Sequence, residues 1–571
     1  MAASAKAVEV IPAGDLGKPA LWEPIEGTPA VESVVVDGKP ALKITCPFST
    51  MEGWRAGADY RFPENADLGG SRWLKVKAKA DDPEAVSEIV LYFQSGAGWY
   101  RGGIGGLKKE WSTLTGTRGR FGTEGVPDGW GRVKQMRVGI MPAAKRDTVV
   151  YISGFEGTSA LGTEDAAKVG HCTTLAELKT CLAGTPQEGE FARGEILLNQ
   201  AEKSGDIEKP EAQKLIKEAR KVFVDAYLRI QKPREGEVRS AWCHSGTGPE
   251  MGWTKAVDLL ADNGFNTIFP NLLWSGVAYY PSKVVPVSPA VAQKGDQLKE
   301  LLEAGKRRGV AVHVWKVCWQ FGWQGDPSYV VPFRFAGRTQ VDRDGKHSDW
   351  LCPVNVANRK YELDAIKELV RNYDIAGFQL DYIRYSGEEW CFCPACKAAF
   401  EKKIGKKLKD WPVPVTGEGK YAGKYDDFRR EAITSFVREV RKETKKIRPS
   451  MKLSADVFPV ADSARNSVFQ DWGLWVREGL VDFVCPMNYT ENLAEMRSRT
   501  AADRDTIAGK APFYEGLYAT YSPDQVQEPD MLAAQIAAAR ELGAGGFVLF
   551  EIQDHVLTGL LPALRLGITK P

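Results

Sequence analysis

Four carboxylates stand at or just after the ends of apolar runs, where a buried strand would reach the edge of a domain. In the segment GFQLDYIRYSG the run ends at Asp381, and an arginine and two tyrosines follow closely. Asp456, Glu515 and Glu551 end or follow similar runs. Two facing carboxyl groups can cleave a glycosidic bond, because one protonates the leaving oxygen while the other attacks the anomeric carbon or activates water. These four residues are the candidate catalytic residues.

Each carboxylate also has a structural interpretation, which the sequence leaves open. Asp381 could pair with Arg384, and Asp456 could cap the loop after its strand. Glu515 and Glu551 could bind sugar hydroxyls or arginine side chains. We expect Asp381 to be the nucleophile or to stabilise a cationic transition state, and Asp456 to be the proton donor. Glu515 and Glu551 are held as alternatives for the acid.

Aromatic and polar side chains occupy the other predicted strand ends. Aromatic rings stack on the apolar faces of sugars, while polar groups bind the hydroxyls. The candidate substrate-binding residues are His244, Trp274, Trp319, Trp323, Arg384, Tyr385, Asn488, Tyr489 and Tyr518. Among the stacking residues Trp319 and Trp323 rank highest, because they follow the third strand where the chain leaves the sheet.

The elements that would position these residues alternate regularly from residue 237 onward. Eight apolar strands, from VRSAWCHSG to GGFVLFEIQD, are separated by segments of helical periodicity, several of which end in glycine. This alternation predicts a (β/α)8 TIM barrel, whose active site would lie at the carboxyl ends of the strands. The sequence contains no G-x-G-x-x-G motif after a first strand and no phosphate loop, and we expect no cofactor.

Two changes of hydrophobic period divide the chain into three parts and make it multidomain. Residues 1–158 contain short alternating strands separated by turn residues, which predicts a carbohydrate-binding-like β-sandwich. Trp99 and Tyr100 lie there in a glycine-rich segment and could form a sugar platform or cover a sheet edge. Residues 159–236 have helical periodicity and predict a connector, and residues 237–571 form the predicted barrel.

Composition excludes several classes of partner. The chain has 76 basic and 74 acidic residues and a net charge of +2, which argues against nucleic acid as the main partner. No apolar run approaches the roughly 20 residues of a membrane span. The start, MAASAKAVEV, resembles the end of a secretory signal, although no charged or apolar region precedes it. We expect a secreted or periplasmic protein whose signal has been removed; a cytosolic start is the alternative.

A cysteine cluster follows the predicted fourth strand. Cys391, Cys393 and Cys396 have the C-x-C-x2-C spacing of soft metal ligands, and Cys352 or a histidine could supply a fourth. A second C-x-x-C pair is missing, so we expect a metal-free cluster that lies on the loop and helix after that strand. There it would shape the site without reacting. A structural metal is the alternative.

Three motifs of the predicted barrel also carry a resemblance. YYPSKVVPVS, VNVANRKYELDAIKELVRNYDIAGFQLDYIRYSG and FQDWGLWVREGLVDFVCPMNYTEN resemble the glycosyl-hydrolase-like family ten of bacterial proteins, over about residues 237–565. The resemblance implies a (β/α)8 barrel, an exported location and hydrolysis of a bacterial or environmental polysaccharide; known relatives act on peptidoglycan glycan strands. The implied functional residues are Asp381, Arg384, Tyr385, Gln470, Asp471, Trp472, Asn488 and Tyr489.

This chain departs from the family pattern at one position and resembles a second family at another. It has Ser386 where relatives have the proline of IRYP. Glu515 and Glu551 are not part of the family motif, which leaves room for a specialised substrate. GFQLD also resembles the fourth-strand nucleophile motif of the α-amylase superfamily, which would make Asp381 the nucleophile and Asp456 its acid/base partner.

The leading prediction is a secreted, cofactor-independent glycoside hydrolase that acts on a polysaccharide or oligosaccharide. The alternative is a catalytically silent polysaccharide-binding protein that uses the barrel as a sugar cradle. The two differ in whether a pair of cleft carboxyl oxygens lies at about 5 to 9 Å. A metal-dependent esterase or deacetylase would need two histidines and an aspartate at one point, and five scattered histidines argue against it.

Overall fold

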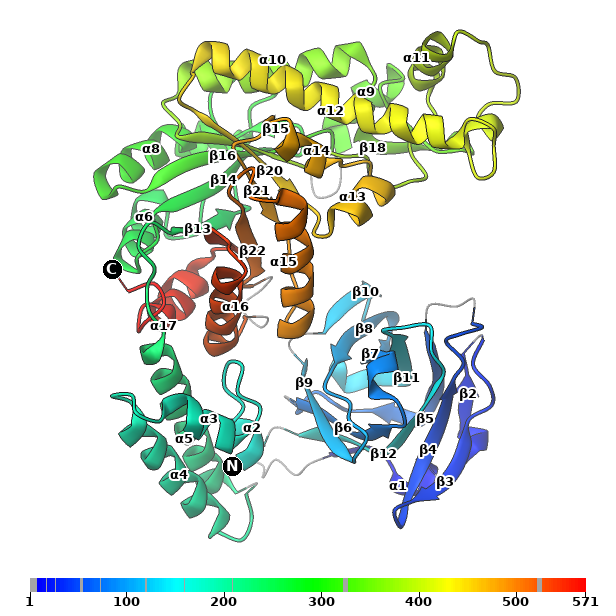
Figure 1. Ribbon diagram of the computed structural model, residues 1–571, viewed down its shortest axis with the longest axis vertical. Helices are drawn as coiled ribbons and strands as arrows, with labels where there is room; N and C mark the ends of the chain where they lie inside the picture. The colour runs from blue at the N-terminus through cyan, green and yellow to red at the C-terminus, as the bar shows by residue number, and fades with distance from the viewer. Residues whose placement is uncertain are drawn as a thin grey trace. The chain divides into compact units, whose positions relative to one another are not determined.

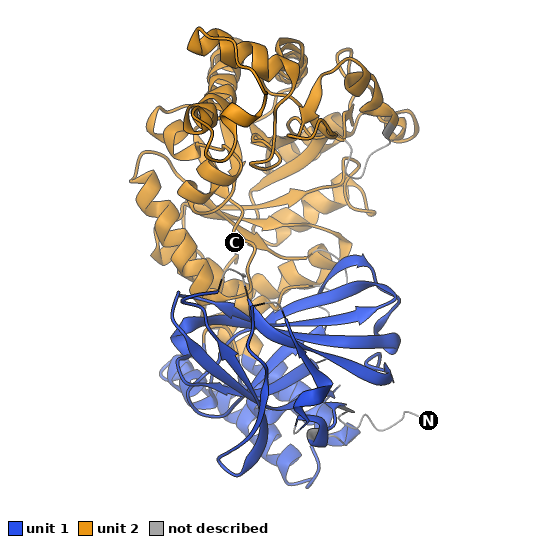
Figure 2. Ribbon diagram, turned by 90° about the vertical axis from the view of Figure 1, so that its right-hand side faces the viewer, with its two compact units in different colours: residues 1–168, 172–223 blue, residues 169–171, 224–571 orange. Residues whose placement is uncertain are grey.

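The computed structural model describes residues 8–570, apart from 17, 26, 52–54, 72, 119–120, 159, 208, 322–326 and 521–525. The chain forms two compact units (Figure 2). One comprises residues 1–168 and 172–223, and the other comprises residues 169–171 and 224–571. No helix in the described ranges is long and apolar enough to cross a membrane.

The first unit contains two antiparallel sheets. One has the order β3 (Glu32–Val36), β4 (Lys39–Cys46), β12 (Thr148–Thr158), β6 (Trp73–Ala80) and β9 (Ser112–Thr117), with β1 (Val8–Ile11) paired to β12. The other has the order β10 (Gly122–Val126), β8 (Ala97–Ile104), β7 (Val86–Ser95), β11 (Val133–Pro142), β5 (Ala56–Ala66) and β2 (Trp22–Pro24). Short elements α1 (Ala13–Leu16), η1 (Pro19–Leu21), η2 (Pro83–Ala85) and η4 (Trp130–Arg132) connect them.

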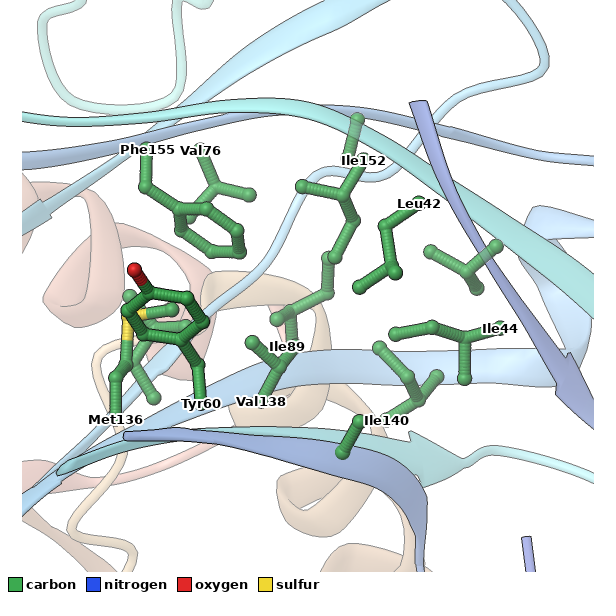
Figure 3. Close-up of a cluster of buried hydrophobic side chains, with 14 of the residues drawn as sticks. Leu42, Ile44, Tyr60, Val76, Ile89, Met136, Val138, Ile140, Ile152 and Phe155 are labelled. Carbon is green, nitrogen blue, oxygen red and sulfur yellow. The ribbon is translucent and has the colours of Figure 1, made fainter. Parts of the chain in front are cut away.

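Alternating side chains build a shared apolar cluster between these strands. In β6, WLKVKAKA, every second residue is buried, as expected for a strand with one covered face. Figure 3 shows Leu42 and Ile152 of the first sheet facing Ile89 and Val138 of the second within one cluster of buried side chains. The predicted β-rich N-terminal region is therefore confirmed as antiparallel sheet.

Helices follow these sheets between residues 160 and 232. They are α2 (Thr163–Ala166), α3 (Leu175–Leu182), α4 (Glu188–Glu202) and α5 (Pro210–Ile230). Helices α3 and α4 belong to the first unit, whereas α5 contributes residues to both units.

The second unit is built on eight parallel strands (Figure 1). In spatial order they are β21 (Phe483–Pro486), β20 (Lys452–Val457), β19 (Gly377–Asp381), β16 (Ala311–Val317), β14 (Thr267–Trp274), β13 (Val238–Cys243), β23 (Gly546–Phe550) and β22 (Tyr514–Tyr518). Parallel bridges Val484–Phe513 and Met487–Gly516 join the two outer strands. The sheet is a nearly closed barrel, which confirms the barrel prediction.

Helices separate the strands along the chain. The longer ones are α6 (Trp253–Asp262), α8 (Gln297–Arg308), α10 (Val356–Asn372), α11 (Pro394–Ile404), α12 (Ala422–Ile447), α15 (Leu493–Ile507) and α16 (Pro529–Glu541). The shorter elements are β15 (Val277–Ala278), α7 (Pro289–Lys294), η5 (Pro327–Tyr329), α9 (Val331–Phe335), β17 (Thr339–Val341), β18 (His347–Leu351), η6 (Val413–Val415), α13 (Ala461–Ser467), α14 (Trp472–Arg477), η7 (Val556–Leu560) and α17 (Leu561–Leu564).

Strand β16 shows how the barrel sorts its side chains. Trp315 and Val317 join the aromatic cluster inside the barrel. Lys316, between them, points to the helices and forms a buried ion pair of 2.7 Å with Glu362 of α10. Successive residues of a strand face opposite sides of the sheet, so this parity tells which residues at a strand end face the barrel interior.

Candidate active site

Asp381 is the last residue of β19 and lies at the carboxyl end of the barrel. Its side chain is buried, with 3% exposed. The indole Nε1 of Trp315 donates to Oδ2 at 3.0 Å, and the backbone N–H of Tyr382 donates to Oδ1 at 2.7 Å. Burial raises the pKa of Asp381 to about 6, although these two donors and the charge of Arg384 oppose the shift. The carboxyl group is thus held in one orientation and titrates near neutral pH.

Asp456 lies on the neighbouring strand β20 and is close enough to interact electrostatically with Asp381. It is 1% exposed, and its Oδ1 has no hydrogen-bond partner. Burial and, secondarily, the charge of Asp381 raise its pKa well above the ordinary range, while the nearby Trp242 indole N–H opposes the shift. The two environments favour an ionised Asp381 beside a protonated Asp456.

A second wall of the mouth consists of His244, Trp274 and Glu551. The His244 ring lies 4.5 Å from the Trp274 ring and 5.7 Å from the ring of Trp315, which holds Asp381. Glu551 follows β23 and accepts the backbone N–H of His244 at 2.6 Å. Burial raises the pKa of Glu551, and burial lowers the pKa of His244. Both residues remain half-buried, so a ligand in the mouth could reach them.

Arg384 lies in an aromatic cage. Its guanidinium carbon is 4.7 Å from the Tyr382 ring, 5.1 Å from the Trp350 ring and 4.6 Å from the Phe458 ring. Trp350 belongs to the β17–β18 hairpin and packs 5.3 Å from Tyr382. Cation–π contacts of this kind hold a guanidinium in place without neutralising it. The predicted proximity of Arg384 to Asp381 is consistent with their electrostatic interaction.

Non-glycine residues in the left-handed region line the same rim. Ser275, Trp319, Tyr382 and Val460 have φ between 50° and 65°, and they follow β14, β16, β19 and β20 within three residues. This conformation is uncommon for residues with a Cβ, and more so for a β-branched valine. At Tyr382 it turns the backbone N–H back onto Asp381. Such outliers cluster at functional sites.

Several predicted binding residues are buried where a substrate could not stack on them. Trp319 is fully buried against Phe436 of α12, with ring centroids 4.7 Å apart. Tyr385 is also fully buried. Asn488 is buried too, and its Nδ2 donates to the Met496 carbonyl of α15. The structure therefore gives these three residues packing roles instead of the expected substrate contacts.

The other predicted binding residues fall into three cases. Trp274 and Tyr489 are half-buried and pack on the interior aromatic cluster, where an approaching ligand could reach them. Tyr518, at the end of β22, is 6% exposed. Trp323 lies outside the described residues.

Glu515 does not lie with Asp381. Its neighbour Tyr514 packs on the cluster inside the barrel, so strand parity turns Glu515 toward the helix layer. There it is fully buried near Asp503 of α15. Burial, followed by the charge of Asp503, raises the pKa of Glu515 to about 8. Strand parity therefore argues against Glu515 as the catalytic acid.

This environment predicts a pH-dependent stability. A carboxyl group with a raised folded-state pKa binds a proton that the unfolded chain releases, so stability is lost as pH rises toward about 8. We expect Glu515→Gln to cancel that loss. Wild type should lose about 2 kcal/mol of unfolding free energy relative to the variant between about pH 6 and 8. Urea denaturation at both pH values measures it, and an equal pH response of the two proteins would contradict the assignment.

The sequence reasoning missed the floor of the mouth. Trp242 of β13 donates its Nε1 hydrogen to the Gln379 amide oxygen at 2.8 Å inside the barrel. Gln379 Nε2 donates to the sulfur of Cys485 at 3.4 Å. Strand parity in the sequence could have revealed Gln379, because it lies two residues before Asp381 and therefore faces the same side of the sheet. Trp350 was missed because it comes from a hairpin outside the barrel sheet.

Candidate metal ligands lie away from these carboxylates. Cys352, Cys391, Cys393 and Cys396 form a compact group after β18 and β19. Across the described part of the chain, no two histidines and an aspartate converge within coordination distance.

Comparison with known protein families identifies the family to which this barrel belongs. Residues 244–535 match the family model described as Glycosyl hydrolase-like 10, which is more than half of the chain. The chain belongs to this family. The match begins at His244 and includes both Asp381 and Asp456.

Relatives of this Glycosyl hydrolase-like 10 protein are distant. An S-layer-related protein of Niallia circulans is 26% identical over 235 residues, which is 35% of this chain and 14% of that protein. Glycosyl hydrolase DigH of Escherichia coli is 24% identical over 285 residues, 44% of this chain and 60% of that protein. The chain therefore matches less than two thirds of either relative.

Solved structures include a similar domain. The glycoside hydrolase domain of PgaB (BpsB) from Bordetella bronchiseptica aligns with a TM-score of 0.48 and 14% identity, covering 59% of this chain and all of that one.

The family motif FQDW mainly supports the strand that carries Asp456. Gln470 accepts the Phe458 N–H at 2.9 Å and donates to the Asp456 carbonyl at 3.2 Å. Asp471 caps α14 by accepting the Leu474 N–H. Trp472 is fully buried and donates to the Phe458 carbonyl. In this Glycosyl hydrolase-like 10 chain the motif is a scaffold for the end of β20.

Proposed function

We propose that the barrel hydrolyses glycosidic bonds in a polysaccharide or oligosaccharide. The observation that carries the proposal is the adjacent pair of Asp381 and Asp456, whose environments favour opposite protonation states. Membership in a glycosyl hydrolase-like family supports the substrate class. Aromatic rings around the mouth, from Trp274 to Tyr489, suit the apolar faces of sugar rings.

In the proposed mechanism the carboxyl groups divide the work. Asp456 transfers its proton to the glycosidic oxygen while the bond between that oxygen and the anomeric carbon breaks. Ionised Asp381 attacks the anomeric carbon or stabilises its positive charge, and water then completes the hydrolysis. Hydrogen bonds from the Trp315 indole and the Tyr382 N–H fix the orientation of the Asp381 carboxylate. Glu551, which is more exposed than Asp456, is the alternative proton donor.

A panel of polysaccharides tests the proposal. Incubation of the full chain with each glycan should release reducing ends from at least one, and NMR of the first product anomer would show whether configuration is retained or inverted. Binding without release on every glycan would favour the alternative, a catalytically silent protein that uses the barrel as a sugar cradle.

We propose further that the two antiparallel sheets form a β-sandwich that binds glycan. The support is a groove of about 1180 Å³ on the sheet that contains β5, β8 and β11. Trp99 lines it, with the Arg137 guanidinium 5.4 Å from its ring. Asp59 accepts two hydrogen bonds from Arg137 at 2.6 and 2.8 Å and one from Gln135 at 2.7 Å. An aromatic face beside ordered polar groups suits a sugar.

We expect Trp99→Ala to weaken glycan binding by about fivefold, because losing one aromatic stacking contact costs on the order of 1 kcal/mol. Isothermal titration of the full chain with a soluble oligosaccharide measures the effect, and hydrolysis in the barrel should keep its kcat. Trp111→Ala, at a half-buried indole that donates to Asp37, is the matched control. Equal affinities of both variants and wild type would refute the groove as a binding site.

Export of the protein remains part of the proposal. Cell-wall and environmental polysaccharides lie outside the cytoplasm, so export would bring the proposed glycan-hydrolysing activity to such substrates. Fractionation of the native host, followed by immunoblotting, would test it.

A further inference from the structure

The cysteine cluster is more complete than its spacing in sequence suggested. Cys391 and Cys393 lie on the loop after β19, Cys396 lies in the first turn of α11, and Cys352 directly follows β18. All four are fully buried, and their sulfur atoms lie within 4.8 Å of one another. Cys352 Sγ is 3.4 Å from Cys396 Sγ and 3.5 Å from Cys393 Sγ.

These distances distinguish among the states that four thiols can adopt. A disulfide would bring two sulfurs to about 2.05 Å, whereas all four cysteines are free. Four sulfurs about 2.3 Å from a shared tetrahedral centre would lie about 3.8 Å apart. The ligand sulfurs of a polynuclear iron–sulfur cluster lie farther apart, because several irons and sulfides separate them. The observed spacing fits one metal ion.

We propose that Cys352, Cys391, Cys393 and Cys396 bind one structural zinc ion. Four thiolates that can surround one ion tetrahedrally form a closed structural zinc site, in which no coordination position is left for water or substrate. The proposal adopts the structural-metal alternative in place of the expected metal-free cluster. Three of the ligands have a recognisable spacing in the sequence. The fourth, Cys352, was one of several candidates, because it comes from a hairpin about 40 residues earlier that has no C-x-x-C pair.

The surroundings are built for negatively charged sulfur. The Val341 N–H donates to Cys391 Sγ at 3.3 Å. Cys393 is the N-cap of the eleven-residue helix α11, whose amino end favours negative charge. The buried guanidinium of Arg429 donates to the backbone oxygens of Glu388 and Trp390, just before the cluster. A tetrathiolate zinc site carries two net negative charges, and these groups offset part of them.

The zinc ion would join two segments that meet at the barrel mouth. Cys352 ends the β17–β18 hairpin, which presents Trp350. Cys391 ends the segment that begins at Asp381 and contains Arg384. Fixing both segments to one ion would hold the Trp350 ring against the Arg384 guanidinium, at the observed 5.1 Å. The ion would therefore act on the mouth by positioning residues, at a distance from the reacting carboxylates.

Metal content of the purified full chain tests this proposal. The protein should be produced without a histidine tag, passed over a chelating resin and analysed by plasma mass spectrometry. We expect about one zinc per chain in wild type and less than about a tenth in Cys393→Ser. Cys46→Ser is the control, because Cys46 is equally buried but lies in the first unit, and it should keep its zinc.

If the serine variants fail to fold, measurements on the wild-type protein alone provide a second test of the zinc site. Titration with a mercurial should release the zinc in step with four thiols, and exchange for cobalt should give the visible bands of tetrahedral thiolate coordination. Wild-type protein without stoichiometric metal, or a denatured mass lower by two protons per disulfide, would overturn the proposal. Stoichiometric iron in place of zinc would overturn the choice of metal.

Discussion

Replacing Asp381 with asparagine should lower kcat by about 10³-fold on whichever glycan wild type cleaves, within the range that one catalytic acid or base contributes. The substitution removes the negative charge that the proposed reaction needs at the anomeric carbon. It also leaves one acceptor oxygen for two donors, the Trp315 Nε1–H and the Tyr382 N–H, so one of them loses its partner. A thermal melt must therefore confirm that the variant is folded before its initial rates are compared.

Glu515→Gln is the matched control for Asp381→Asn. It also replaces a buried carboxyl group by an amide, but on the helix side of the barrel, and a pKa of about 8 keeps Glu515 protonated at neutral pH. We expect its kcat to stay within about twofold of wild type. If Asp381→Asn retains more than about a tenth of wild-type turnover, a barrier change below about 1.4 kcal/mol, Asp381 is not catalytic.

The second large effect is expected at Asp456. Wild-type kcat/KM should rise with pH as Asp381 ionises near about 6, because the carboxylate must be charged. It should fall at higher pH, as the proton of Asp456, whose pKa is raised, is lost. Asp456→Asn should lower kcat/KM by about 10²- to 10⁴-fold and abolish the alkaline limb, because no proton donor remains to titrate.

A change of leaving group separates loss of the acid from general damage. An aryl glycoside with a good leaving group needs little protonation, so Asp456→Asn should recover most of its activity on that substrate, whereas Asp381→Asn should not. If Asp456→Asn is equally impaired on both substrates, and Glu551→Gln shows the recovery, the acid role belongs to Glu551.

The sequence predicted the barrel and the place of its mouth because both depend on local patterns. Eight apolar runs separated by helical segments indicate alternating strands and helices. Asp381 could be identified because a charged residue directly ends its apolar run. The orientation of Glu515 also follows from a local pattern. Successive strand residues face opposite sides of the sheet, so an inward-facing Tyr514 predicts that Glu515 faces the helices.

Other parts of the site depend on contacts that no local pattern encodes. Trp319 looked accessible because it follows a strand, but α12, more than 100 residues later, covers it with Phe436. Trp350 reaches Arg384 from a hairpin, and Cys352 joins three cysteines from a distant segment. The sequence named Cys352 only as one candidate beside the histidines, and nothing in it indicated the other two contacts, because only the folded chain brings such residues together.

The left-handed residues along the rim imply a trade-off between stability and activity. Glycine or asparagine would adopt the backbone at Tyr382 and Val460 with less strain, so selection for thermostability alone would favour them. The chain keeps a ring at Tyr382, which the Arg384 guanidinium needs as a wall. Directed evolution toward higher melting temperature should therefore accumulate its gains at this rim first, and those gains would erode turnover. An engineer seeking a more stable protein would do better to leave these turns unchanged and to improve the helices behind them.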